Sequence, residues 1–357
     1  MDDTQPDPPV GLPGGPLVGE GDSSPLTRRR GAVPGEGIDA PVAAHYGDPL
    51  REQRLLGEGL AVVDLSHRGV VTVAGPDRRS WLHSLTTQHL ADLAPRQSRE
   101  SLVLSPKGHV EHALHVVDDG ERLWLGVEPA EAPTLTAWLD SMRFMLRVEV
   151  EDVTASYATL GEPIGAEGVE GEPVTWLDPW PGPVGDTAAY APVEDHPGRE
   201  RRWREVFVPR DRMESVVGDR PLAGLWAAEA ARVLAWRPRL GFETDHRTIV
   251  HELDWLRVAV HLHKGCYRGQ ETVARVHNLG RPPRRLVFLH LDGSGHVLPD
   301  RGCDLTLDGR SVGRLTSVAR HFEDGPVALG VVKRSTPVEA VLLAGGVAAS
   351  QTVIVPR

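Results

Sequence analysis

Cysteine is scarce in this chain of 357 residues, which holds only Cys266 and Cys303. Two cysteines in unlike surroundings cannot form the disulfide framework that stabilises small secreted proteins, so we expect a reducing compartment. Cys303 lies in PDRGCDLTLDG, which is typical of a turn between strands, and we expect it to be structural. Cys266 lies in HLHKGCYRGQETVARVHNLGR, residues 261–281, the segment with the densest packing of reactive and hydrogen-bonding side chains.

A net positive charge and long apolar runs are also missing. The formal net charge is -11, which has the wrong sign for a protein that binds nucleic acid through a broad basic surface. No apolar run approaches the roughly 20 residues of a membrane-spanning helix, and the N-terminus has no apolar signal core. We therefore expect a cytoplasmic protein that binds neither nucleic acid nor a membrane, and we expect a monomer. The overall charge still allows a local basic pocket for a small anionic ligand.

Lysine is the third scarce residue, because Lys107, Lys264 and Lys333 stand against 36 arginines. Where arginine is the default cation, a lysine indicates a place that needs a compact ammonium group. Lys264 lies two residues before Cys266, and Lys107 lies in a Pro-Lys-Gly turn.

The chain divides into three parts by composition. Residues 1–40 are rich in Pro and Gly with few apolar anchors, which predicts a disordered tail. Residues 41–283 mix alternating segments, such as GVVTVAGPD, with helical periods such as RRSWLHSL, which predicts an α+β fold. Within them, residues 161–200 read as a Pro/Gly-rich surface excursion with apolar anchors at Trp176 and Trp180. Residues 284–357 consist of short β-rich segments and turns, which predicts a small antiparallel barrel or sandwich.

Cys266 has three readings from its neighbourhood alone. Lys264 and Arg268 make the surroundings electropositive, which favours the reactive thiolate and indicates a functional thiol. A free cysteine packed under a turn is the structural alternative. His261 and His263 would add two nitrogen ligands for a metal, but no second cysteine lies nearby to complete a tetrahedral set, so we expect no metal site.

The segment KGCYRGQE, residues 264–271, resembles the diagnostic K-G-C-Y-x-G-Q-E motif of the YgfZ/GcvT family of folate-binding proteins. GVVTVAGPDRRSWLHSLTTQHL and LVLSPKGHVEHALHVV are similar to the opening strand–helix and the following hairpin of that family. The resemblance extends from about Leu60 to Pro356. It implies two intertwined α/β domains around a central folate channel, followed by a C-terminal antiparallel β-barrel.

The cysteine in the motif is typical of the YgfZ branch, whose members resemble tetrahydrofolate-binding proteins that help to make or repair iron–sulfur clusters. The resemblance therefore implies tetrahydrofolate or a derivative as the cofactor and iron–sulfur enzymes as client proteins. The other branch is the glycine-cleavage aminomethyltransferase, so folate-dependent one-carbon transfer is the alternative function.

Two departures from the transferase branch put its reaction in doubt. The acidic pair that the transferase needs reads His112 and Ala113 here, and alanine cannot stabilise a developing cationic centre. The R-x-E-A-G element reads Arg232 to Trp236, which keeps the arginine and loses the glutamate. Whether the chain is an enzyme stays open on the sequence.

The resemblance also indicates candidate site residues. Glu205 falls where the family has a glutamate in F-E-L-Y-V-P, and is a candidate partner for the pterin's amide and amino edge. Cys266 is the candidate functional thiol. Lys264 and Arg268 are expected to attract an anionic tail or partner, and Gln270 and Glu271 to hydrogen-bond within the fold. The candidate folate-contacting residues are together Glu205, Arg232, Lys264, Tyr267, Arg268, Gln270 and Glu271.

Overall fold

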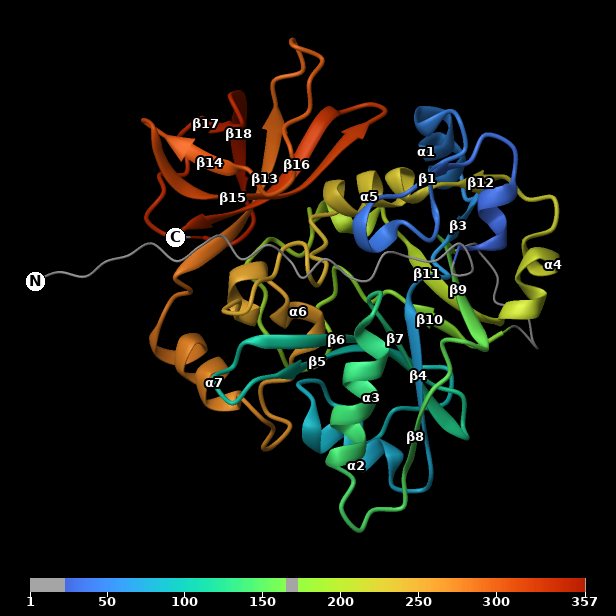
Figure 1. Ribbon diagram of the computed structural model, residues 1–357. Coiled ribbons are helices and arrows are strands. Elements are labelled where there is room, and N and C mark those ends of the chain that lie inside the picture. Colours follow the sequence, from blue (N-terminus) through green and yellow to red (C-terminus); the bar gives the residue numbers. More distant parts are fainter. Residues whose placement is uncertain (1–22, 165–172, 357) are drawn as a thin grey trace, which may run out of the picture.

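The computed structural model describes residues 23–164 and 173–356, which form two five-stranded sheets and a closed barrel (Figure 1). The barrel lies at the upper left of Figure 1, and the two sheets lie below and to the right of it. Helix α5 (Leu225–Leu234) runs between the barrel and the sheets. None of the helices in the described part of the chain is long and apolar enough to cross a membrane.

The first sheet is antiparallel with the strand order β5-β6-β7-β4-β8. Its strands are Ser98–Leu104, Val110–Asp118, Arg122–Val127, Gly69–Ala74 and Glu149–Asp152. Helices α2 (Arg78–Leu85) and α3 (Glu131–Ser141) cover one face, where they pack against the side chains of Leu114 and Val116. Because side chains alternate along a strand, Ala113 and His115 of β6 point to the other face of this sheet, toward the middle of the molecule.

The second sheet has the strand order β10-β11-β9-β3-β12, in which β12 runs parallel to β3. Its strands are Thr175–Leu177, Trp203–Pro209, Tyr157–Pro163, Val62–Asp64 and Leu222–Ala223. Trp124 of the first sheet packs in one apolar cluster with Trp176 and Phe207 of the second. Helix α1 (Pro49–Gly57) contacts α5 beside this sheet, and α4 (Met213–Val217) follows β11.

The C-terminal strands close into a six-stranded antiparallel barrel because the first, β13, pairs with both β16 and the last, β18. The strands β13 to β18 are Arg284–Leu291, Asp304–Leu307, Arg310–His321, Gly325–Lys333, Leu342–Ala344 and Val347–Val353. The prediction of an α+β fold with a C-terminal β-barrel is confirmed. Closure removes the free sheet edges that would otherwise be open to further pairing.

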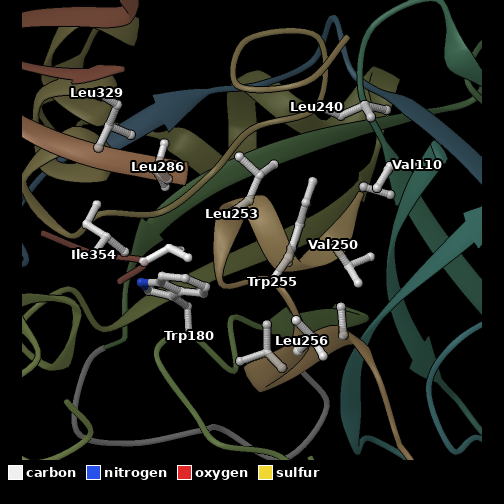
Figure 2. Packing of buried hydrophobic residues seen from close by; sticks show 14 of the residues in the cluster. Val110, Trp180, Leu240, Val250, Leu253, Trp255, Leu256, Leu286, Leu329 and Ile354 are labelled. Carbon is white, nitrogen blue, oxygen red and sulfur yellow. The ribbon is translucent and has the colours of Figure 1, made fainter. Parts of the chain in front are cut away.

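One apolar cluster joins the barrel to the central part of the chain (Figure 2). Leu286 and Leu329 come from the barrel, Leu253 from the short helix η5 (Val250–Leu253), and Trp255 from the turn before α6 (Leu256–Ala259). Burying one such large apolar side chain stabilises a fold by about 1.5–3 kcal/mol. The cluster therefore holds the barrel and the central segments in one packed body.

The prediction of a disordered segment over residues 1–40 is wrong for its second half. Residues 23–40 contain two short 3-10 helices and the strand β1 (Val33–Pro34), which pairs with β2 (Ala43–His45). Leu26 is fully buried in an apolar cluster, and Asp39 bonds to Arg239. These tertiary contacts offset the chain entropy that the Pro/Gly-rich composition alone leaves uncompensated. Residues 1–22 lie outside the described residues.

The predicted excursion over residues 161–200 is more integrated than its composition indicates. Its first residues complete β9, and β10 pairs with β11 at the sheet edge. Trp176 and Trp180 are buried as the predicted anchors, at 0% and 4% exposure. Residues 165–172 lie outside the described residues. Asp178 of this segment lines a cavity that lies between the two sheets.

Candidate functional site

A cavity of about 450 Å³ lies between the two sheets and the segment that follows α5. This volume includes space that is open to solvent. The lining residues are Arg68, Glu100, Ala113, His115, Gly126, Val127, Glu128, Asp178, Arg201, Glu205, Arg232, Arg237, Pro238, Arg239, Leu240 and Trp255. Charged side chains of both signs dominate this lining, and they are held by one another.

Glu205 stands on β11 with a side chain that is only 2% exposed. Its Oε1 accepts from Arg68 at 2.5 Å, and its Oε2 bonds to Nδ1 of His115 at 2.7 Å. Burial disfavours the charged carboxylate, but His115 and Arg68 outweigh burial and hold the pKa of Glu205 well below its usual range. Glu205 therefore stays ionised at neutral pH.

His115 lines the cavity and is half-buried, with 17% of its side chain exposed. Its ring stacks on Trp176 with a centroid distance of 3.8 Å and an interplanar angle of 1°. The sequence does not predict this position, because the alternation along β6 identifies two faces of a strand but not what covers each of them. Here the second sheet covers the face that carries His115.

Arg232 lies on α5 and is 4% exposed. It donates to Glu229 on its own helix, to Glu243 at 3.0 Å and to Ser317 of the barrel strand β15 at 2.6 Å. It also donates to the carbonyl of Arg237 at 2.6 Å. Arg232 thus ties α5, the segment after it and the barrel together beside the cavity.

Arg237 and Arg239 flank Pro238 in the segment that leaves α5. Arg237 donates through Nη2 to Glu100 at 2.8 Å and through Nε to Asp178 at 3.3 Å. Arg239 bonds to Asp39 and Glu128 at 2.8 and 2.9 Å. Burial lowers the pKa of both guanidinium groups, but the neighbouring carboxylates outweigh it and raise both above their usual range.

Some buried polar atoms of the lining residues have no partner among the described residues. They are Glu100 Oε2, Arg237 Nη1, Arg68 Nε and Arg201 Nε. Buried polar groups in folded proteins are almost always hydrogen-bonded, so such atoms indicate the polar contacts that a ligand or water would complete. The cavity therefore fits a compact polar ligand with both donors and acceptors.

The acidic pair of the transferase branch is absent from this cavity. Ala113, which the resemblance sets at one position of that pair, lines the cavity with a methyl group. His112, the neighbouring residue on β6, bonds instead to Glu131 of α3 on the other side of the sheet. Neither residue supplies a negative charge to the cavity.

The KGCYRGQE segment forms a loop that runs into the first two residues of α7 (Gln270–Leu279). Gly265 and Gly269 have φ angles of 100° and 83°, which favour glycine, and a Cβ on Gly269 would meet the Ser105 carbonyl at 2.5 Å. Gln270 Oε1 accepts from the backbone N–H of Tyr267 at 3.0 Å, so the prediction that Gln270 bonds within the fold is confirmed. Glu271 is exposed in the first turn of α7.

Lys264 and Arg268, which are expected to attract an anion, both have partners within the protein. The ammonium of Lys264 donates to the backbone carbonyls of His83 and Thr86 at the end of α2, and burial lowers its pKa to about 7. Arg268 pairs with Glu111 at 2.8 Å and lies over the ring of Trp138 at 5.7 Å. These contacts dock the loop on the first sheet and its helices.

Cys266 is exposed at the tip of this loop. No residue from Lys264 to Glu271 lines the cavity between the sheets, so within the described ranges the loop and the cavity are separate features. The described residues also contain no group of three or more His, Cys, Asp or Glu side chains that could hold a metal ion.

Both the sequence and the fold of this chain are similar to those of known proteins. Residues 28–161 match the family described as the GCVT N-terminal domain. The crystal structure of the glycine cleavage system aminomethyltransferase T from Bartonella henselae superposes with a TM-score of 0.72 at 20% identity, covering 93% of this chain and 95% of that one. The chain has a GcvT-like fold. At this identity the structural likeness establishes the fold alone.

Two relatives align over most of this chain. A putative chloroplastic transferase from Arabidopsis thaliana is 26% identical over 301 residues, which are 77% of this chain and 66% of that protein. An aminomethyltransferase from Symbiobacterium thermophilum is 26% identical over 313 residues, which are 80% of each chain. The predicted likeness to the GcvT family is thus confirmed for the N-terminal domain match and for the aminomethyltransferase-like fold.

The structure brings together only part of the predicted site. Glu205, Arg232 and Ala113 meet in the cavity. Sequence reasoning missed the arginine and carboxylate pairs around Arg237. One signal was available, because LAWRPRLGF places two arginines in an otherwise apolar segment, and arginine is almost never fully buried unless it is paired.

Proposed function

We propose that this chain binds tetrahydrofolate or a derivative in the cavity between its sheets and acts as an accessory protein in iron–sulfur cluster assembly or repair. One observation carries the proposal: Glu205 and Arg232, which the resemblance assigned to folate, line the same cavity as Ala113, which replaces the transferase carboxylate. The site keeps the means to bind a polar heterocycle and loses the acid that the transfer reaction needs.

The residues of the cavity fit such a ligand. A reduced pterin is a flat heterocycle whose edge carries both hydrogen-bond donors and an acceptor. The unpartnered buried atoms of Glu100 and Arg237 offer the matching acceptor and donor, and Trp255 adds a flat apolar wall. When bound, a reduced folate supplies nitrogen atoms that can carry a one-carbon unit.

The carboxylates that remain in the cavity are poor candidates for proton transfer. Burial acts against their ionisation, but the pKa of Glu205 is held low by His115 and Arg68, and that of Asp178 by Arg237 and Arg201. A general base works best when its pKa lies near the operating pH. These groups hold charge and orientation, which supports binding more than catalysis.

Aminomethyl or other one-carbon transfer is the second candidate. The aligned relatives favour it, since both are named as transferases, one of them an aminomethyltransferase. It predicts turnover of an aminomethyl donor in the presence of tetrahydrofolate despite Ala113.

In this proposal the thiol of Cys266 contacts the client protein. It is exposed on a glycine-hinged loop that is anchored by Lys264 and Arg268, so a partner can reach it without opening the cavity. A loop held in this way presents its thiol in one position, which favours contact with a protein surface.

Three measurements test the proposal together. Titration of the purified protein with tetrahydrofolate should give saturable binding, and incubation with an aminomethyl donor should give no turnover. A strain without the protein should lose activity of iron–sulfur enzymes under oxidative stress. The Cys266→Ala variant should fail to restore that activity while it binds folate normally.

Cys303→Ala is the matched control, because Cys303 lies partly buried in the barrel, and this variant should complement fully. Absence of folate binding would overturn the cofactor assignment. Turnover of the aminomethyl donor would favour the second candidate, and full complementation by Cys266→Ala would remove the thiol from the proposed function.

A further inference from the structure

Glu100 is a buried carboxylate in the cavity wall that the sequence motifs did not single out. It lies on β5 with 0% exposure. Its Oε1 accepts two hydrogen bonds, from Trp255 Nε1 at 2.9 Å and from Arg237 Nη2 at 2.8 Å. Its Oε2 has no partner among the described residues, so one half of this carboxylate is held and the other half is free.

Arg237 likewise has some donor atoms that are bonded and one that is not. Its Nη2 and Nε bond to Glu100 and Asp178, whereas its Nη1 has no partner among residues 23–164 and 173–356. Both side chains line the cavity, and the bond between them keeps the free acceptor and the free donor on neighbouring groups. A buried polar atom without a partner costs free energy, most of all on a charged group.

Glu205 differs from Glu100 in this respect. Both of its oxygens are already bonded, to Arg68 and His115. The residue that the motif assigned to the pterin edge is therefore the better-satisfied carboxylate, and Glu100 is the one that a ligand would complete.

We propose that Glu100 and Arg237 form the recognition pair of the cavity, which takes a planar ligand edge where an N–H group stands beside a carbonyl. The N–H donates to Glu100 Oε2, and the carbonyl accepts from Arg237 Nη1. The lactam edge of a reduced pterin has this order of groups. The inference rests on the proposed folate binding and deepens it, and it makes Glu205 a positioning residue that holds Arg68 and His115.

The Glu100→Gln variant tests the pair with little change in shape. The amide oxygen has to stay where Trp255 and Arg237 donate, so the amide NH2 takes the place of Oε2 and meets the ligand N–H with a second donor. Loss of a hydrogen bond to a charged group predicts a 10- to 100-fold (order-of-magnitude) increase in the Kd for tetrahydrofolate, measured by calorimetric titration.

Glu162→Gln is the matched control. Glu162 is also buried and bonded by two arginines, Arg204 and Arg220, but it does not line the cavity. This variant should bind tetrahydrofolate like the unaltered protein. Circular dichroism and thermal unfolding of both variants show whether each is folded.

The outcomes separate the inference from the proposed function. Unchanged affinity of a folded Glu100→Gln variant would overturn the recognition pair and leave folate binding in place, whereas no binding by the unaltered protein would overturn both. If the variant does not fold, a crystal structure of the unaltered protein with tetrahydrofolate decides. A pterin nitrogen within roughly 3.2 Å of Glu100 Oε2 supports the pair, and a pterin bound through Glu205 alone overturns it.

Discussion

Replacement of Arg237 by methionine removes the cation that holds two buried carboxylates in the cavity wall. Asp178 keeps Arg201 at 2.7 Å and the backbone N–H of Trp180, so it stays paired. Glu100 keeps only the indole N–H of Trp255. The variant thus leaves one buried charge with a single neutral hydrogen bond.

Breaking a buried ion pair from one side costs about 3–5 kcal/mol, because the remaining charge is uncompensated. Methionine fills a similar volume, which keeps the added cost of a cavity small. With an unfolding entropy of about 2.1 cal/mol/K per residue, this loss corresponds to a decrease in Tm of about 4–7 °C for a chain of this length.

The assay is thermal unfolding of four proteins: unaltered, Arg237→Met, Glu100→Gln and the double variant. Glu100→Gln removes the carboxylate charge that Arg237→Met leaves without a cation. The double variant should therefore recover about 1 kcal/mol or more of the unfolding free energy that Arg237→Met loses. A decrease in Tm below about 1 °C for Arg237→Met would refute the reasoning, since a loss that small is typical of surface sites. Simple additivity of the two single variants would refute the coupling between them.

Three further predictions concern the core and the charges. Leu253→Ala should cost about 2–5 kcal/mol in unfolding free energy, because Leu253 is fully buried in the cluster of Figure 2. Lys264→Met should flatten the rise of stability between about pH 7 and 10, because the Lys264 pKa is about 7 when folded and about 10.4 when unfolded, so the unfolded chain binds more protons in that window. Asp39→Asn should cost stability at neutral pH and progressively less below about pH 4, because burial opposes but Arg239 outweighs it to hold the Asp39 pKa below its usual value.

The core prediction has a control variant, and the two charge predictions are checked by their pH dependence. Leu279→Ala changes a leucine that is 87% exposed and should stay within about 0.5 kcal/mol of the unaltered protein. Equal losses at both leucines would contradict the packing of the cluster. For Lys264 and Asp39 the measurement is the denaturation midpoint as a function of pH, and a variant curve parallel to that of the unaltered protein would show that the group does not titrate as stated.

The sequence predicted the parts of the fold that depend on local pattern. Short alternating segments after Arg284 predicted the barrel, because each strand carries its own period-2 signal. Gly265 and Gly269 of the motif adopt left-handed φ angles, which glycine tolerates without strain. The ordered segment 23–40 could not be predicted in the same way, because Leu26 and Asp39 are held by partners that lie far along the chain.

The residues of the candidate site also divide into those that a local motif identifies and those that depend on distant partners. Motif resemblance identified Glu205, Arg232 and the loss of an acid at Ala113, since each stands at a recognisable place in a short segment. It did not identify Glu100, Arg237 or His115 as cavity residues. Their roles depend on which charge stands opposite, and pairs such as Glu100 and Arg237 are separated by more than a hundred residues.

The sequence and its motif resemblance determined the α+β class, the β-rich C-terminal part and the reading of the acidic pair as His112 and Ala113, but left open whether Cys266 is exposed. Only the tertiary structure decided that the KGCYRGQE loop and the cavity are separate, and which buried charges are satisfied. The physical reason is that strand and turn preferences are local, whereas the pairing of a buried charge depends on distances across the whole molecule.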